Sequence, residues 1–123
     1  MSFKNLNEEV IADGYQTATA TLTSDISDIT FMDCISYQAT LTGTANGTFT
    51  IQVSNTYDAV KDTGTFVNTA VTLAQTSGAF SGGATSGMLV LGEWKLPYKY
   101  CRLSYTNTSG DGYCSAVFNG KGI

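Results

Sequence analysis

The stretch ISYQATLTGTANGTFTIQVSN, residues 35–55, decides the fold of this chain. On both sides of a small, polar centre, apolar side chains occupy every second position: Ile35, Tyr37, Ala39, Leu41, Phe49, Ile51 and Val53. Alternation of period two is typical of strands that have one buried and one wet face. The centre contains Asn46-Gly47, a dipeptide that tolerates the positive φ of tight turns. We therefore predict an antiparallel hairpin in which these two strands pair directly.

The same alternation recurs nearer the C-terminus. Residues 98–106 place Cys101, Leu103 and Tyr105 on one face, and residues 113–119 do the same for Cys114, Ala116 and Phe118. The turn-forming residues 107–112 separate the two stretches, so we predict a second hairpin, with Cys101 nearer Val117 than Cys114.

Shorter signals complete the set of strands. Residues 17–23 alternate threonine with apolar residues, residues 65–75 alternate with an irregularity near Asn68, and residues 88–91 form an apolar run typical of a strand buried on both faces. Seven or eight short strands, with turn signals about every ten residues and no amphipathic helix, predict an all-β fold. We expect an antiparallel β-sandwich or jelly roll.

Residues 1–14 differ from the rest of the chain. They hold two of the three glutamates, lack alternation and end at the turn dipeptide Asp13-Gly14. We predict an extended N-terminal arm over residues 1–14, either frayed or laid along a neighbouring molecule, and one β-sandwich domain over residues 15–123.

Charge excludes several classes of partner. Only 13% of the 123 residues are charged, the net charge is −4, and the six basic residues are scattered. A nucleic-acid-binding protein needs a basic stripe, so nucleic acid and anionic membranes are poor partners. No apolar run approaches the roughly 20 residues of a membrane span. The first residues lack the features of a signal peptide, and we expect synthesis in the cytoplasm.

The sequence offers little for catalysis. Histidine is absent, so the commonest general base and metal ligand is missing. The carboxylates map to the arm, to loops and to strand ends, and Cys34, Cys101 and Cys114 lack metal-site or redox spacing. We expect reduced, buried thiols, no metal, no cofactor and no enzymatic activity.

Aromatic residues provide one alternative. Trp94, Tyr98 and Tyr100 lie close together in the sequence and, with Tyr57, could form a platform on which a sugar stacks. Aromatic residues also occupy sandwich cores and protein interfaces, where they bury large areas. Both interpretations stay open at this point.

Four segments in order resemble a small virion protein of tailed bacteriophages: residues 35–55, the glycine-rich middle, LPYKYCRLSYTNTSGDG (96–112) and AVFNGKG (116–122). The positions that match are Gly43, Thr44, Gly47, Thr48, Ser54, Asn55, Tyr100, Arg102, Tyr105, Thr106, Ser109, Gly110 and Gly112. The chain departs from the pattern after Asn55, where a tryptophan is expected and Asn-Thr-Tyr-Asp stands instead.

The resemblance implies a discoidin-like jelly roll on the outside of a phage particle, made in the host cytoplasm. We expect a capsid decoration or cement protein, a homo-oligomer such as a trimer, that binds the major capsid protein or other virion proteins. The arm would dock through Phe3, Lys4, Leu6, Val10 and Ile11. The alternative is a carbohydrate-binding or host-adhesion module of the head or of a tail fibre, which would use Trp94, Tyr98, Tyr100 and Tyr57.

Overall fold

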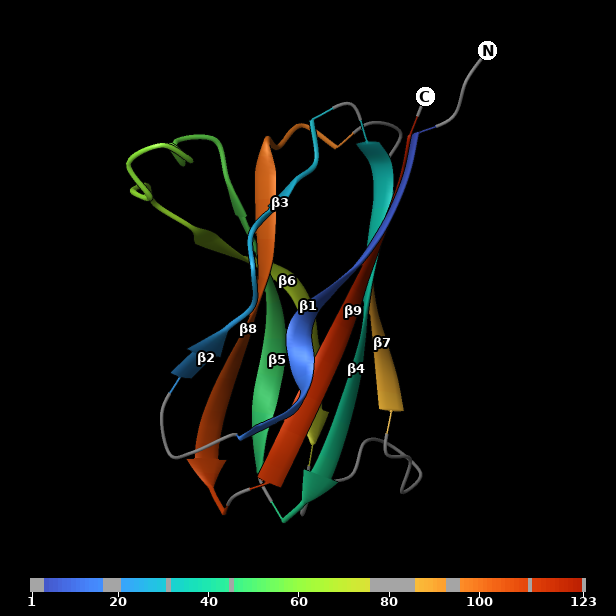
Figure 1. The fold of residues 1–123 in the computed structure, drawn as a ribbon, viewed down its shortest axis with the longest axis vertical. Helices are drawn as coiled ribbons and strands as arrows, with labels where there is room; N and C mark the ends of the chain where they lie inside the picture. Colours follow the sequence, from blue (N-terminus) through green and yellow to red (C-terminus); the bar gives the residue numbers. More distant parts are fainter. Residues whose placement is uncertain are drawn as a thin grey trace.

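The computed structural model describes residues 4–16, 21–30, 32–44, 46–75, 86–92, 96–110 and 112–122, with side chains from residue 22 onward except 41, 42, 75, 112 and 113. These ranges contain nine strands and no helix (Figure 1). In chain order they are β1 (Lys4–Gln16), β2 (Thr21–Thr23), β3 (Ser27–Asp28), β4 (Met32–Gly43), β5 (Asn46–Ser54), β6 (Val67–Gln75), β7 (Ser86–Gly92), β8 (Tyr100–Ser109) and β9 (Gly112–Gly122).

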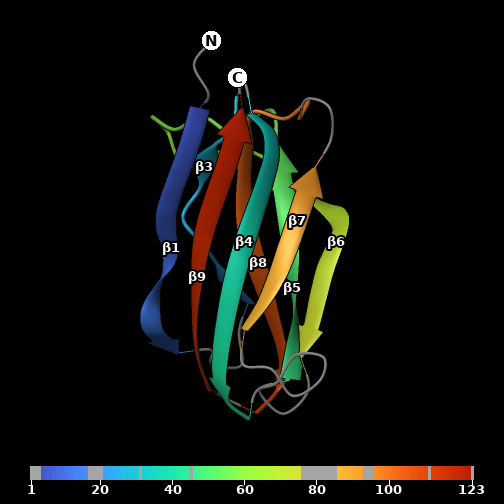
Figure 2. The same ribbon diagram turned by 90° about the vertical axis from the view of Figure 1, so that its right-hand side faces the viewer.

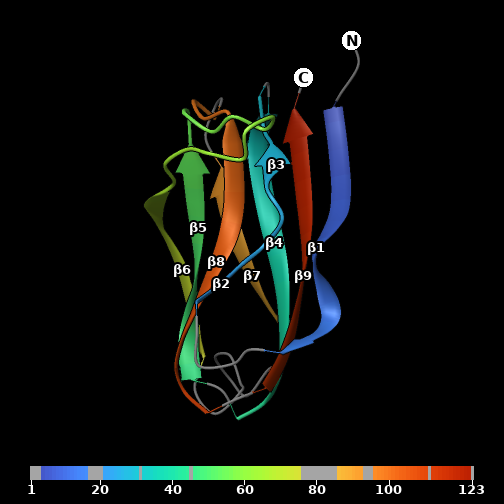
Figure 3. The ribbon, with the colours of Figure 1, turned by 60° about the vertical axis from the view of Figure 1, so that its left-hand side comes forward.

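The strands form two antiparallel sheets that pack face to face, as Figure 3 shows from the side. The β4 sheet has the order β1-β9-β4-β7, and the β5 sheet has the order β2-β8-β5-β6, with β3 also paired to β8. The paired strands are nested in the sequence: β5–β6 is the innermost pair, followed outward by β4–β7, β2–β8 and β1–β9. The chain is therefore equivalent to one long hairpin that is folded over into two layers. This is the topology of a jelly roll, and the predicted all-β antiparallel sandwich is confirmed.

Both predicted hairpins are wrong, because their strands lie in different sheets. β4 pairs with β7 and β9, whereas β5 pairs with β6 and β8. Likewise β8 and β9 follow one another in the chain but cross from the β5 sheet to the β4 sheet. Alternation is identical in a hairpin and in such a crossover, since the same side chains face the interior in both. Gly43, at φ 101°, and Gly110, at φ 72°, adopt the left-handed backbone beside these two crossovers.

The N-terminal segment is extended, as predicted, but it is paired within its own chain. β1 runs along β9 from Lys4 opposite Gly122 to Gln16 opposite Tyr113, so the strand passes the boundary expected after Gly14. Its register shifts between Glu9 and Ile11 and again between Ile11 and Tyr15. Extra residues at such bulges change which side chains share a face, so a strict alternation is not expected beyond Glu9.

The core lies between the sheets and follows the predicted faces. Among the side chains that the structure describes, sixteen apolar ones are at most 7% exposed, the largest being Tyr37, Phe49, Tyr105 and Phe118. Within the β4 sheet the rings of Tyr37 and Phe118 lie 5.3 Å apart, and within the β5 sheet those of Phe49 and Tyr105 lie 4.7 Å apart. The Tyr37 hydroxyl and the Cys101 Sγ, 3.0 Å apart, form a buried hydrogen bond across the layers.

The β7 strand corrects the prediction for residues 88–91. Only Leu89 is buried, whereas Met88 and Val90 are 54% and 53% exposed. β7 is an edge strand of the β4 sheet, as its outer position in Figure 2 shows. The predicted irregularity near Asn68 is confirmed, because the register between β5 and β6 shifts between Thr50 and Gln52, opposite residues 68–72.

All three cysteines are free thiols; Cys101 and Cys114 are buried, as expected, whereas Cys34 is only half-buried. Cys101 lies opposite Val53 of β5, and Cys114 lies opposite Leu41 of β4, so the two thiols belong to different sheets. Burial raises the pKa of Cys114 to about 11 and that of Tyr105 to about 12.

We predict that Gly47→Ala destabilises the fold by roughly 1–3 kcal/mol, since a Cβ atom there meets the carbonyl oxygen of Thr106 and the Tyr105 hydroxyl, which cannot both move. The matched control is Gly92→Ala, whose Cβ would lie 3.5 Å from the Cys34 Sγ, an ordinary contact. Chemical unfolding measures both variants. Equal stability of the two would contradict this account of Gly47.

We also predict that stability falls between about pH 9 and pH 11. The pKa of the Cys114 thiol rises from 9.0 to about 11 on folding, so the unfolded chain loses its proton first and unfolding becomes easier as pH rises through this window. Between the two pKa values of this thiol, its contribution lowers the free energy of unfolding by up to roughly 1.4 kcal/mol per pH unit. Unfolding midpoints from pH 7 to pH 11 measure it; Cys114→Ala should reduce the loss, most clearly between pH 9 and pH 10, because above pH 10 the raised pKa of Tyr105 still contributes to it. An unchanged curve in Cys114→Ala would contradict the role of this thiol.

Candidate functional site

Three aromatic rings gather where the chain leaves β5, enters β6 and starts β8. The Tyr57 ring lies 5.1 Å from that of Tyr100, edge to face, and 5.7 Å from that of Phe66. All three side chains are half-buried. Tyr57 lies near the start of the loop 55–65 and Phe66 directly follows it; the loop extends beyond the sandwich (Figure 1).

Hydrogen bonds within the chain hold this loop. The Ser54 Oγ accepts bonds from the backbone N–H groups of Thr56 and Tyr57, and the Asp58 Oδ1 accepts from those of Val60 and Lys61. The Tyr57 hydroxyl donates to the Asp62 Oδ1 at 2.8 Å. This bond to a carboxylate raises the pKa of Tyr57.

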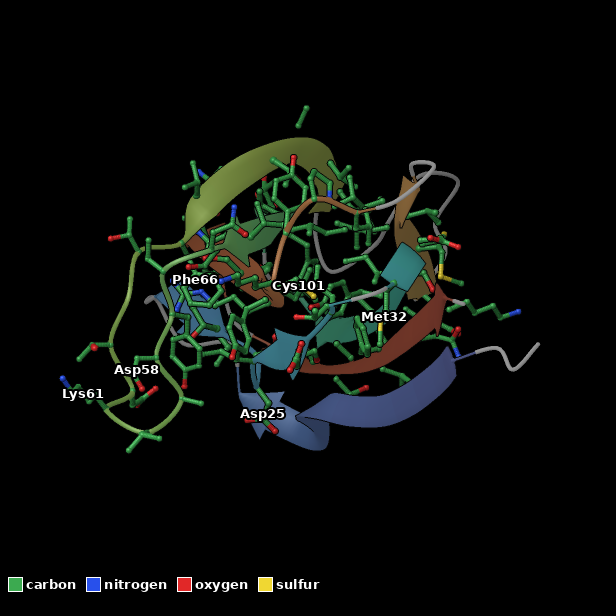
Figure 4. All side chains as sticks on the ribbon, turned by 90° about the horizontal axis from the view of Figure 1, so that it is seen from above. Asp25, Met32, Asp58, Lys61, Phe66 and Cys101 are labelled. Atoms are coloured by element: carbon green, nitrogen blue, oxygen red, sulfur yellow. The ribbon has the colours of Figure 1, made fainter. Side chains whose placement is uncertain are left out.

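Arg102 lies next to the aromatic rings on the outer face of the β5 sheet. Its guanidinium carbon is 4.2 Å from the centre of the Phe66 ring, a cation–π contact. Its Nε–H donates to the Gln52 Oε1 at 2.7 Å, and the Gln52 Nε2 donates to the Asn68 Oδ1 at 2.7 Å. Partial burial lowers the pKa of Arg102, which nevertheless stays charged. Figure 4 shows Phe66 over the sheet, and Asp58 and Lys61 farther out on the loop.

A separate cavity of about 630 Å³ opens between the ends of β5 and β6 and the end of β7. Its walls are mainly apolar and uncharged: Val53, Ser54, Asn55, Thr56, Thr65, Val67, Asn68, Thr69, Ala70, Val71, Leu91 and Tyr98. Tyr98 belongs to this cavity wall, where it packs against the core.

The structure therefore brings together two of the four predicted platform residues. Tyr57 and Tyr100 are in contact, Tyr98 lines the cavity, and Trp94 lies outside the described residues. Binding of a sugar by these side chains stays a prediction.

The predicted docking residues of the arm are placed by their backbone alone. Phe3 lies outside the described residues, while Lys4, Leu6, Val10 and Ile11 belong to β1. Lys4 is opposite Gly122, Leu6 is opposite Gly120, and Val10 falls in the first register shift. Their role in docking stays a prediction.

Sequence reasoning missed Gln52, Phe66, Asn68 and Arg102 as members of one site. Alternation placed Gln52 and Arg102 on the outer faces of their strands, and that is where they lie. The pairing of β5 with both β6 and β8, which makes Gln52 the neighbour of Asn68 and Arg102, could not be read from either strand alone.

The described residues contain no group of three His, Cys, Asp or Glu side chains placed to hold a metal ion. In the same part of the chain, no helix is long and apolar enough to cross a membrane.

Comparison with known proteins places the fold among proteins of prophages and viruses. No family model matches the sequence, and no curated protein matches it. The SPBc2 prophage-derived protein YomS has a similar structure, with a TM-score of 0.55 at 7% identity over 97% of this chain and 96% of that one.

Two further structures share the fold over part of their length. The VP2 subviral particle of infectious bursal disease virus gives a TM-score of 0.61 at 14% identity, over 97% of this chain and 32% of that one. The PBSX exported protein XepA gives 0.55 at 9% identity, over 98% of this chain and 39% of that one. The chain thus spans nearly all of YomS and about a third of the other two.

Proposed function

We propose that this chain is a structural protein of a bacteriophage particle, and specifically a decoration or cement protein on the outer surface of the capsid. The observation that carries the proposal is the jelly-roll topology, which occupies nearly the whole chain and is shared end to end with a prophage-derived protein of similar extent. The sequence resemblance to small virion proteins supports the same conclusion.

Such a protein works by shape and adhesion. Its partners would be the major capsid protein or other virion proteins and further copies of itself, and it would need neither cofactor nor catalytic group. It would be made in the host cytoplasm and end on the virion.

The open edges of the two sheets support assembly. β6 and β7 are edge strands, and their sixteen residues include no charged side chain. Charged residues on an edge normally block pairing with another chain, so an uncharged edge favours it. Met88 and Val90 add exposed apolar side chains to the same side of the sandwich.

We predict that the purified protein binds capsids that lack it and raises the temperature at which those capsids open. Co-sedimentation and a thermal assay measure the two effects. Capsids that already carry the protein are the control, because their sites are occupied. Failure to bind or to stabilise the bare capsids would reject the decoration role.

The contact between Tyr57 and Tyr100 favours host adhesion as a second candidate function, because paired aromatic rings can stack against a sugar. A glycan array with the wild type, Tyr57→Ala and Trp94→Ala tests it. We predict, under this candidate, that at least one glycan binds and that the signal falls about tenfold or more in Tyr57→Ala. Binding that neither substitution changes, or no binding at all, would reject it.

A further inference from the structure

The hydrogen bonds around Arg102 leave mainly donors free. A guanidinium group donates and never accepts, so the atom of Gln52 that it contacts must be the oxygen Oε1. The other end of this amide is then Nε2, a donor, and the Asn68 atom that it meets must be the oxygen Oδ1. Donor and acceptor roles along the whole chain of contacts are fixed in this way.

What remains at the outer end of this chain is a set of N–H groups. Among the described residues, no other hydrogen bond or ion pair engages the Nη groups of Arg102 or the Nδ2 group of Asn68. The site therefore carries one positive charge and several unused donors, whereas each of the two amide oxygens already accepts one hydrogen bond. A ligand that complements it must be rich in acceptors and negatively charged.

Arg102 is also held in place before any ligand arrives. Phe66 lies under the guanidinium group, Gln52 fixes its Nε, and Tyr57 packs against Phe66. A guanidinium held by stacking and by its Nε still presents its two Nη groups as a fork, which matches the two oxygens of a carboxylate. Less side-chain entropy is then lost on binding.

The surroundings favour a protein as the source of the carboxylate. Val67, next to Phe66 in the chain, is 60% exposed, and Val60 on the adjoining loop is 95% exposed. Tyrosine and arginine beside apolar side chains are the residue types that dominate the energetics of protein interfaces.

We propose that Arg102 and Asn68 bind the carboxylate of an acidic side chain on the protein partner, with the rings of Tyr57, Phe66 and Tyr100 forming the adjoining part of the contact. The proposal rests on the proposed function for the identity of the partner, the capsid, but not for the chemistry of the site.

The carboxylate itself is tested with sodium acetate as the probe. In NMR spectra of the isotope-labelled protein, we expect the Nε–H signal of Arg102 and the NH₂ signals of Asn68 to shift with acetate and not with sodium chloride at equal ionic strength. In Arg102→Met, which keeps the apolar stem without the donors, the Asn68 shift should be lost. Equal shifts with both salts, or an unchanged Asn68 response in the variant, would overturn the site.

The partner is tested with capsids that lack this protein. We expect Arg102→Met to weaken binding roughly tenfold or more, Arg102→Lys and Asn68→Ala to weaken it several-fold, and Lys61→Met to change it less than about twofold. Lys61 is the matched control because it is an exposed cation on the loop 55–65, beside the site, and makes no contact with Gln52, Phe66, Asn68 or Arg102 that would place it in the site. Thermal unfolding of each variant separates lost binding from lost folding.

The outcomes distinguish the two proposals. If the wild type binds capsids and Arg102→Met binds equally well, the carboxylate contact is wrong while the decoration role stands. If the wild type binds no capsids but binds polygalacturonate in a manner that depends on Arg102, both the decoration role and the protein source of the carboxylate are wrong.

Discussion

Across the middle of the sandwich, the Tyr37 hydroxyl meets the Cys101 thiol at 3.0 Å, and both groups are fully buried between the layers. The ring of Phe118 lies 5.3 Å from that of Tyr37, and the rings of Phe49 and Tyr105 are buried in the same core. Each such ring buries about 150–250 Å². This single apolar layer joins the two sheets, because β4, β5, β8 and β9 contribute to it the faces that their alternation provides. The outer faces and the edges are thereby left free for contacts with other molecules.

The same alternation explains how much of the fold could be predicted. It identified which residues of β4, β5, β8 and β9 face inward, since a period of two is a local property of the chain. It could not tell a hairpin from a crossover between sheets, because both put the same side chains inside. The turn residues do not distinguish these two cases either. A glycine with positive φ, such as Gly43 or Gly110, allows the chain to reverse, but it does not determine which sheet the next strand joins.

Two smaller errors have related causes. The apolar run Met88–Leu91 indicated a strand buried on both faces, yet β7 is an edge strand on which only Leu89 is buried. Hydrophobicity alone does not say whether another layer covers a face. Conversely, residues 4–16 lacked any periodicity and still form a strand, in which two register shifts interrupt the pairing with β9.

The candidate site depends on pairing that is not local. Gln52, Asn68 and Arg102 come from three strands, and the register that aligns Gln52 with Asn68 on one side and with Arg102 on the other sets their contact. The sequence predicted that Tyr57 and Tyr100 belong together, but it had no signal for the stacking of Arg102 on Phe66. Only the order β8-β5-β6 makes these residues neighbours.

The two sides of the sandwich differ in a way that bears on assembly. β1, the edge strand on one side, carries Lys4, Glu8, Glu9 and Asp13, whereas β6 and β7, the edges on the other side, carry no charge. Charged residues on an edge strand disfavour uncontrolled pairing with another chain, whereas β6 and β7 lack this protection. An assembly built on the β7 edge would leave the Arg102 cluster available, since β7 belongs to the β4 sheet whereas Gln52, Asn68 and Arg102 belong to the β5 sheet. Contacts between copies and contacts with a larger particle can therefore use different surfaces of this small domain.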